Sequence, residues 1–235
     1  MLVRRRAPAR TLIDLKCTSL HANAGQNDPR ALLASTIDAP EGLHIIYNSS
    51  MRSVVLCLGI SLDGYIARPD GGVDFLFMPK DYSMADFFSS IDTVIMGRKT
   101  YDKSREMGGG SYPSMKTYVL SRTLAPDERE GLTFVNQDLN SFVHELRKHP
   151  GKDMWLMGGG ELARDFLKED LVDELYLGIV PVLLGEGIPL FPAGFPQRNF
   201  SLRENKTFSR GLIALKYKRL RSKPKRNPEA REPFH

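Results

Sequence analysis

The sequence predicts an α/β fold: one mostly parallel β-sheet of about eight strands, with helices on both faces and an antiparallel hairpin at its C-terminal end. From Ser53 onwards, apolar segments rich in β-branched residues alternate with segments whose apolar residues recur at helical spacing. That alternation is typical of parallel strands joined by helices. Residues 200–207 and 212–219 both alternate apolar and polar side chains around Ser209-Arg210-Gly211, and therefore predict the hairpin.

The first half of the predicted domain supplies three strands and two helices. Residues 53–60 are mostly apolar, as expected for a strand buried on both faces, and Pro69-Asp70-Gly71-Gly72 after it marks a turn. Residues 82–90 carry apolar side chains at helical spacing and predict the first helix. The next elements in chain order are a strand at 93–96, a short helix from Arg98 and a strand at 116–120.

The second half continues the same alternation. Asp138 is placed to cap a helix that runs to about Lys148, because apolar side chains fall on one face of that segment. A short strand at 132–135 precedes this helix. The elements that follow it are a strand at 153–157, a helix at 161–168 and a strand at 173–180.

Composition excludes several classes of protein. No apolar run in the 235 residues approaches the ~20 needed to span a bilayer, so we expect no membrane partner. The two cysteines, Cys17 and Cys57, form no disulfide framework or metal-ligand cluster, and the histidines show no ligand spacing. We therefore predict no metal site, and a reducing compartment, the cytoplasm, as the location.

The net charge of +5 resides at the two ends of the chain. Residues 1–50 carry six basic and four acidic side chains, and residues 218–235 carry seven and two, which leaves 20 basic and 22 acidic residues between them. The central region therefore has no general attraction for nucleic acid. We predict a disordered extension or targeting segment at 1–50, one domain at 51–220 and a disordered basic tail at 221–235. The early arginines of the first segment faintly resemble an organelle transit sequence.

Three predicted strands each end in groups that can hold phosphate. The strand at 93–96 is followed by Gly97-Arg98-Lys99-Thr100, the strand at 116–120 by Ser121-Arg122, and the strand at 153–157 by Gly158-Gly159-Gly160. The carboxyl ends of neighbouring parallel strands face one crevice, where open α/β sheets bind nucleotides. Glycines before a helix let backbone amides approach a pyrophosphate, and two arginines suit a 2′-phosphate. The pattern predicts NADPH rather than NADH as cofactor.

In order and in sequence, these motifs resemble the dihydrofolate reductases. Ser61-Leu62-Asp63-Gly64-Tyr65-Ile66-Ala67 and Leu171-Val172-Asp173-Glu174-Leu175 are more similar to one branch, the C-terminal reductase domain of the bacterial bifunctional deaminase-reductase of riboflavin synthesis. The resemblance covers about 53–218. It implies a dihydrofolate-reductase-like fold, NADPH, and hydride transfer to a nitrogen heterocycle or its sugar imine. It assigns the adenosine-phosphate side to Gly97, Arg98, Lys99, Thr100, Ser121 and Arg122, and the pyrophosphate to Gly158, Gly159, Gly160, Glu161 and Leu162.

Two residues depart from the riboflavin branch. Cys57 stands where that branch has a lysine before Ser-Leu-Asp-Gly, and Met157 stands where it has a glutamate before the paired glycines. Both are polar substrate contacts in that branch. The departures therefore predict a substrate bound differently from the pyrimidine of riboflavin synthesis.

Three functions remain open on the sequence. The first is the riboflavin-type reductase with a heterocyclic substrate, in which the loop at 67–76 closes over the nicotinamide. The second is a dihydrofolate reductase in which Asp81 is the carboxylate that holds the pterin, although Asp81 equally suits a helix N-cap. The third is a non-catalytic NADPH-binding module, which the loss of both polar contacts favours. A homodimer is the assembly considered for each.

Overall fold

The computed structural model describes residues 51–110, 112, 114–123, 127–129 and 131–221. The expected segments at 1–50 and 221–235 lie outside these residues, except for Arg221. Among the described residues, no helix combines the length and the apolar character that crossing a membrane requires.

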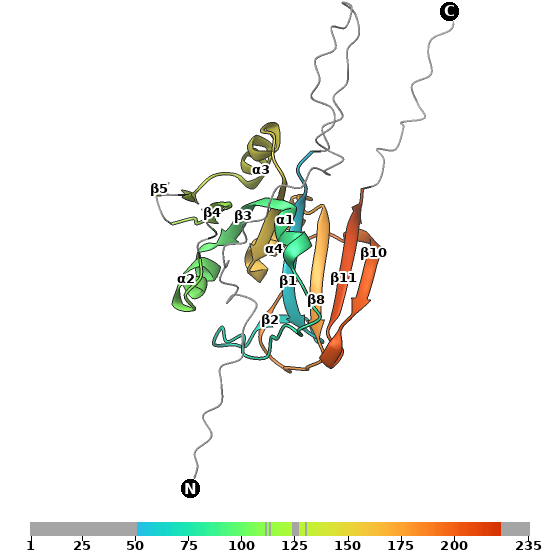
Figure 1. The fold of residues 1–235 in the computed structure, drawn as a ribbon. Coiled ribbons are helices and arrows are strands. Elements are labelled where there is room, and N and C mark those ends of the chain that lie inside the picture. Colours follow the sequence, from blue (N-terminus) through green and yellow to red (C-terminus); the bar gives the residue numbers. More distant parts are fainter. Residues whose placement is uncertain (1–50, 111, 113, 124–126, 130, 222–235) are drawn as a thin grey trace, which may run out of the picture. The chain divides into compact units, whose positions relative to one another are not determined.

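The core of the fold is a nine-stranded sheet (Figure 1). Six adjacent strands, from β8 to β6, run parallel, and the strands beyond them at both edges are antiparallel. The spatial order is β10 (Asn199–Thr207), β11 (Ile213–Leu220), β8 (Glu174–Val180), β1 (Val54–Ser61), β7 (Asp153–Gly158), β3 (Ile91–Gly97), β4 (Lys116–Leu120), β6 (Leu132–Val135) and β5 (Asp127–Arg129). The predicted α/β class and the C-terminal hairpin, closed through η1 (Ser209–Gly211), are confirmed.

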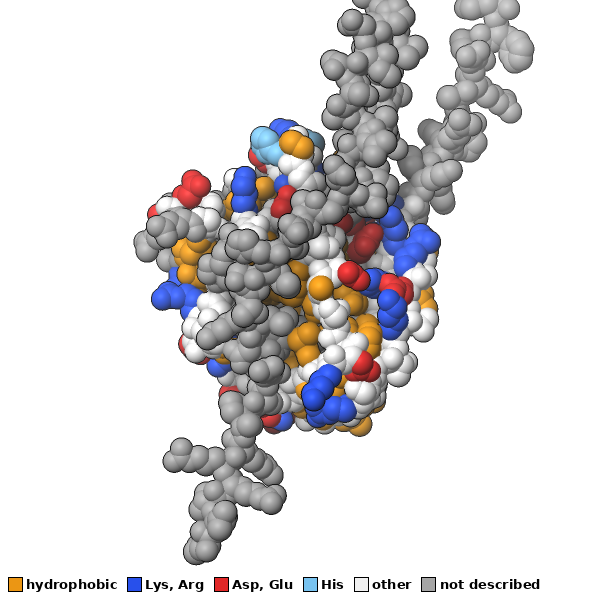
Figure 2. Space-filling model, viewed as in Figure 1, with side chains coloured by type: hydrophobic (Ala, Val, Ile, Leu, Met, Phe, Trp, Pro, Cys, Tyr) orange, Lys and Arg blue, Asp and Glu red, His pale blue; other side chains and the backbone are white. Residues whose placement is uncertain are grey.

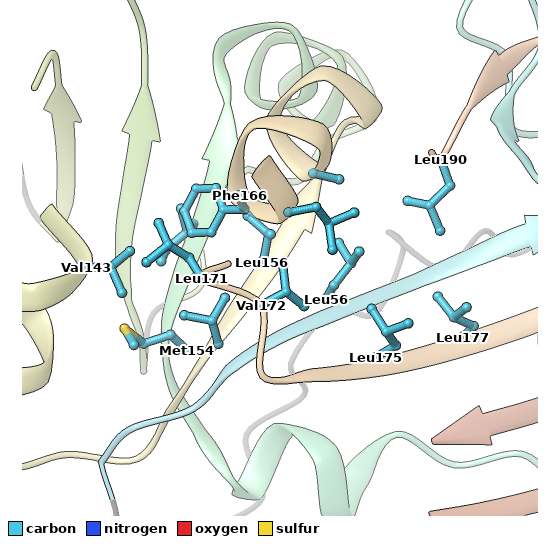
Figure 3. Packing of buried hydrophobic residues seen from close by; sticks show 14 of the residues in the cluster. Leu56, Val143, Met154, Leu156, Phe166, Leu171, Val172, Leu175, Leu177 and Leu190 are labelled. Atoms are coloured by element: carbon cyan, nitrogen blue, oxygen red, sulfur yellow. The ribbon is translucent and has the colours of Figure 1, made fainter. Parts of the chain in front are cut away.

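Two pairs of helices cover the sheet, one pair on each face. Phe87 of α1 (Ala85–Ser89) and Tyr101 of α2 (Arg98–Glu106) pack into one apolar cluster. Side chains of α3 (Leu139–Lys148) and α4 (Gly160–Lys168) pack into the other, which Figure 3 shows around Phe166 and Leu156. Alternate residues of each central strand enter opposite clusters, which explains their nearly continuous apolar sequences. We call the two sides the α1/α2 face and the α3/α4 face.

The structure corrects three details of the predicted elements. The first helix is Ala85–Ser89 rather than 82–90, because Tyr82 and Met84 reach the core from the preceding loop. The sheet has a ninth strand, β5, whose sequence Asp-Glu-Arg carries no apolar pattern. A separate two-stranded sheet, β2 (Tyr65–Ala67) with β9 (Ile188–Pro189), was also not predicted. By contrast, Asp138 caps α3 as expected, since its carboxylate accepts from the Ser141 amide at 2.8 Å.

Ion pairs tie strands together at the amino-terminal edge of the parallel strands. The Arg52 side chain, 8% exposed, pairs with Asp92 at the start of β3 and donates to Thr93 Oγ1 at 2.7 Å. Asp173, just before β8, accepts from the Val54 amide and from Arg147 at the end of α3. Each of these contacts joins residues that are far apart in the sequence, so they stabilise the order of the strands.

Candidate functional site

The strand register brings the three predicted phosphate-binding endings to one edge of the sheet. Met96 lies beside Gly158, because β3 and β7 are neighbours. Gly97 lies beside Leu120 on the other side of β3, and Leu120 lies beside Val135 of β6. The residues that follow β3, β4 and β7 therefore share the carboxyl edge, as parallel strands require.

The turn after β3 leads directly into α2, with Gly97 as its N-cap residue. The Arg98 Nε donates to both carboxylate oxygens of Asp102 at 2.8 Å, one turn along the same helix. The guanidinium also lies 6.0 Å from the centre of the Phe134 ring on β6, so it reaches across the end of β4. The Lys99 side chain is 92% exposed, with its Nζ 4.0 Å from Glu161 Oε1 of α4.

The glycine turn after β7 packs against the turn after β3. Gly158 has a φ of +92°, which favours glycine, and the Gly158–Gly159 peptide bond is cis. A Cβ built on Gly159 would lie 3.4 Å from Thr100 Oγ1 and 3.5 Å from Ile66 Cδ1, so this space is narrow but open. A Cβ on Gly160 would overlap the Pro189 carbonyl oxygen, so the protein itself fills that space. Gly160 therefore serves packing, whereas a Cβ at Gly159 would make only ordinary van der Waals contacts, so protein packing does not require glycine there.

The remaining predicted residues of this edge lie beside the two turns. A Cβ on Gly97 would come within 3.9 Å of Leu162 on α4, which shows how closely the two helix starts approach. Ser121 is buried, its amide donates to the Val135 carbonyl at 2.9 Å, and its Oγ accepts from the Thr123 amide at 3.3 Å. Arg122 is exposed, and its carbonyl accepts from Asn136 Nδ2 at 3.3 Å. The edge thus combines glycine backbone, hydroxyls and basic side chains, a donor set that suits phosphate.

Asp81 lies in the loop before α1, ahead of the N-cap residue Met84. Its carboxylate accepts from the Ser209 hydroxyl at 2.7 Å and from the Ser209 amide at 2.8 Å, which lowers the Asp81 pKa. These bonds tie the loop before α1 to η1, at the turn of the C-terminal hairpin. The alternative that Asp81 caps the first helix is wrong, because Met84 is the N-cap residue and no side chain caps that helix.

A small cavity of about 10 Å³ lies on the α1/α2 face. Cys57 of β1 and Tyr176 of β8 form part of its wall, and Tyr82, Met84 and Leu212 enclose it from loops. Burial raises the pKa values of the Cys57 thiol and of the Tyr82 hydroxyl, and a hydrogen bond with Tyr176 raises the latter further. Figure 2 shows hydrophobic side chains gathered in the middle of this face, over β1 and β8.

Trp155, the only tryptophan of the chain, is hydrogen-bonded to the wall of this cavity. Its indole Nε1 donates to the Cys57 carbonyl at 2.9 Å, and its ring packs edge-on against Phe87, Phe88 and Tyr112. Met157, the second departure from the riboflavin branch, is buried with its Sδ 3.7 Å from the Tyr112 hydroxyl. Burial raises the pKa of Tyr112 to about 12. Both departures thus lie in neutral, mostly apolar surroundings.

No pattern in the sequence reveals this cavity. Its residues come from segments more than a hundred positions apart, such as Tyr82 and Leu212, and no local motif joins them. The one usable signal was Gly178, which interrupts an apolar strand, as glycine does where another backbone or a ligand approaches closely. The described residues bring together no three His, Cys, Asp or Glu side chains that would hold a metal.

This arrangement is an α/β domain with a nine-stranded mixed sheet, whose glycine-rich and basic turns lie at one edge. The model of the family described as the RibD C-terminal domain matches residues 52–214. The chain belongs to that family and has its dihydrofolate-reductase-like fold.

Two relatives from Bacillus subtilis (strain 168) match most of the chain. YyaP is 36% identical over 186 residues, which is 72% of this chain and 96% of that protein. YwjB is 36% identical over 165 residues, covering 68% and 95%. Both are named as uncharacterized proteins. The match covers nearly the whole length of both relatives, and neither name supplies a substrate.

Solved structures show the same fold. A protein of Shewanella sp. PV-4, whose name links it to riboflavin biosynthesis, is 27% identical with a TM-score of 0.65, over 72% of this chain and 99% of that one. RibD of Acinetobacter baumannii (form 2) is 21% identical with a TM-score of 0.55, over 73% of this chain and 59% of that one. The second likeness concerns the fold alone.

Proposed function

We propose that the protein is an NADPH-dependent reductase that transfers hydride to a nitrogen heterocycle. The observation that carries this proposal is the meeting of three strand endings at one edge: the basic turn after β3, Ser121-Arg122 after β4 and the glycine turn after β7. Family membership supports an oxidoreductase, because the family includes the reductase domain of RibD proteins.

The chain's residues would hold the cofactor by its phosphates. The pyrophosphate would lie against Gly159 at the start of α4, where backbone amides and the helix dipole favour negative charge. Thr100 borders the same space and can donate its hydroxyl. Arg98 and Arg122 would pair with the 2′-phosphate that distinguishes NADPH from NADH. The donor set therefore fits the phosphorylated dinucleotide.

Bound NADPH supplies the hydride, so the protein needs only to orient the two rings and exclude water. The substrate side would be the α1/α2 face, where Cys57 and Tyr176 lie beside the strands that end at the cofactor edge. The loop at 67–76 would close over the nicotinamide, and its Arg68 is already paired with Asp74 at 2.7 Å.

A non-catalytic NADPH-binding module is the second candidate, and the size of the cavity favours it. The space of about 10 Å³ is roughly that of one water molecule, so a heterocycle enters only if the enclosing loop moves. A dihydrofolate reductase that uses Asp81 is less well supported, since Ser209 already takes both oxygens of that carboxylate.

The test is a titration of the full-length protein with NADPH and with NADH, followed by Trp155 fluorescence. We expect saturable binding of NADPH at least tenfold tighter than of NADH. Equal affinities would contradict the 2′-phosphate assignment. NADPH oxidation with a panel of heterocycles then separates the enzyme from the module, and competition by methotrexate would favour the folate alternative.

A further inference from the structure

The sheet surface under the cavity has a row of positions with almost no side chain. Gly59 of β1 lies in register with Gly178 of β8, and Gly178 lies in register with Ala214 of β11. Residues in register across strands point to the same face, and Cys57, Val180 and Ala214 place that face on the α1/α2 side. The row therefore forms a shallow trough three strands wide, which we call the glycine trough.

Larger side chains border the trough on both sides. Cys57 and Tyr176, themselves in register, form one border, and Val180 and Leu212 form the other. Tyr82 and Met84 lie above it, with the Tyr82 hydroxyl 2.8 Å from the Met84 sulfur. A Cβ built on Gly178 would meet nothing nearer than the Gly59 Cα at 4.0 Å. The absence of a side chain at Gly178 is thus not required by protein packing.

The described residues that line the cavity are all uncharged. Its polar atoms are the Cys57 thiol and tyrosine hydroxyls, and burial holds the thiol and the Tyr82 hydroxyl in their neutral forms. Lys216 of β11 lies in register with Tyr176 of β8. Its Nζ is 4.9 Å from the centre of the Tyr176 ring and 2.8 Å from a Glu204 oxygen. A charged ligand group placed in the trough would lose hydration and would find the nearest ammonium already paired.

We propose that the glycine trough binds the ring of an uncharged, flat, apolar heterocycle, with Gly178 setting the depth of the site. That the bound ring is a substrate rests on the proposed function. That the ring binds in the trough does not. The flat floor suits a planar ring, and the aromatic border suits edge or face contacts. Because the cavity holds only about 10 Å³, the proposal requires Tyr82 and Met84 to move outward for the ring to enter. Ligands with a phosphate or carboxylate at the buried end are rejected.

The test uses quinoxaline, a neutral two-ring heterocycle, and quinoxaline-2-carboxylate as its charged counterpart. The full-length protein without NADPH is titrated with each, followed by fluorescence of Trp155, whose indole is hydrogen-bonded to the backbone of the trough border, and by calorimetry. We expect saturable quinoxaline binding and at least tenfold weaker binding of the carboxylate. No saturable binding of quinoxaline, or equal binding of both, would overturn the proposal.

Variants of Gly178 locate the site. Gly178→Val places methyl groups in the trough and should weaken quinoxaline binding at least tenfold, with Gly178→Ala intermediate. Gly178→Ala should not lower the melting temperature, because alanine suits a strand better than glycine and the Cβ meets no clash. It therefore keeps the test valid if the γ-carbons of Gly178→Val destabilise the protein. Ile179→Val, one residue along β8 and on the opposite face, is the matched control and should leave the affinity within about twofold.

The outcomes also separate this inference from the proposed function. Quinoxaline binding that Gly178→Val abolishes, in a protein that does not bind NADPH, would support the trough and contradict the reductase. NADPH binding without quinoxaline binding would contradict the trough and leave the proposed reductase standing. If Gly178→Val binds quinoxaline as tightly as the unchanged protein, the ring binds elsewhere and the trough is not the site.

Discussion

The two edges of the parallel strands use arginine in different ways. At the amino-terminal edge, Arg52 and Arg147 are largely buried and pair with carboxylates distant in the sequence, Asp92 and Asp173. At the carboxyl edge, Arg98 is 42% exposed and meets a carboxylate only one turn along its own helix. Buried pairs hold segments together, whereas exposed basic groups contribute little to folding and can serve a ligand. The difference predicts that the first edge determines stability and the second determines cofactor affinity.

The largest effect is expected at the amino-terminal edge. Asp173→Ala leaves the Arg147 guanidinium, 17% exposed, without its carboxylate and removes the acceptor of the Val54 amide. Breaking such a pair should lower the free energy of unfolding by about 3 kcal/mol, measured by urea denaturation. NADPH affinity should not change. Arg221→Ala, which removes a more exposed partner of Asp173, is the control and should cost less than about 1 kcal/mol. A similar loss for both variants would contradict the distinction.

At the carboxyl edge, the glycine turn offers a pair of neighbouring changes with opposite expectations. Gly159→Val should weaken NADPH binding at least a hundredfold, about 2.7 kcal/mol, with the fold retained, because its side chain fills the space beside Thr100. Gly160→Ala should instead damage folding, since its Cβ would overlap the Pro189 carbonyl. Fluorescence titration and circular dichroism check both. A Gly159→Val protein that binds NADPH normally would show that the turn is only structural.

The basic residues of the same edge should show smaller, cofactor-specific effects. Arg98→Ala and Arg122→Ala should each weaken NADPH binding roughly ten- to hundredfold, the value of a charge-assisted hydrogen bond. Binding of NADH should change by less than about twofold, and the melting temperature should hardly move, because both side chains are exposed. Equal losses for the two cofactors would place these arginines on another part of the ligand.

The composition of the carboxyl edge could be predicted from the sequence, because it depends on local patterns. The strand endings at Gly97, Leu120 and Gly158 are visible as apolar segments that stop at glycine or basic residues, and parallel strands must bring such endings to one edge. The polar strand β5 and the two-residue strand β9 carry no apolar alternation, so no sequence pattern reveals them. Both are strands only because their backbones hydrogen-bond to a neighbouring strand, β6 for β5 and β2 for β9.

The glycine trough could not be predicted for a related reason. It depends on the register between Gly59, Gly178 and Ala214, and register is a property of paired strands rather than of any one strand. The partner of Asp81 was equally hidden, since Ser209 lies 128 positions away. Sequence motifs located the phosphate-binding turns, whereas the shape of the substrate side required the assembled sheet.

The smallest effect is expected for Asp81, an exposed carboxylate bonded to Ser209 beside the carboxyl end of β8. It tests whether such a carboxylate acts in chemistry or in structure. Its pKa lies below the ordinary 3.8 because the Ser209 hydroxyl and then the Ser209 amide donate to it. A depressed pKa contributes stability that is complete above 3.8 and is lost as the pH falls through the lower value of the folded protein. Asp81→Asn should therefore lower the melting temperature slightly at pH 7, and this difference should shrink at a pH below the depressed value. Reduction of any accepted heterocycle should keep its rate and its pH profile in the variant, because Ser209 already occupies both oxygens. If Asp81→Asn instead lowered the rate at neutral pH with no change in melting temperature, the carboxylate would act on the substrate, and the folate-type alternative would replace the structural role.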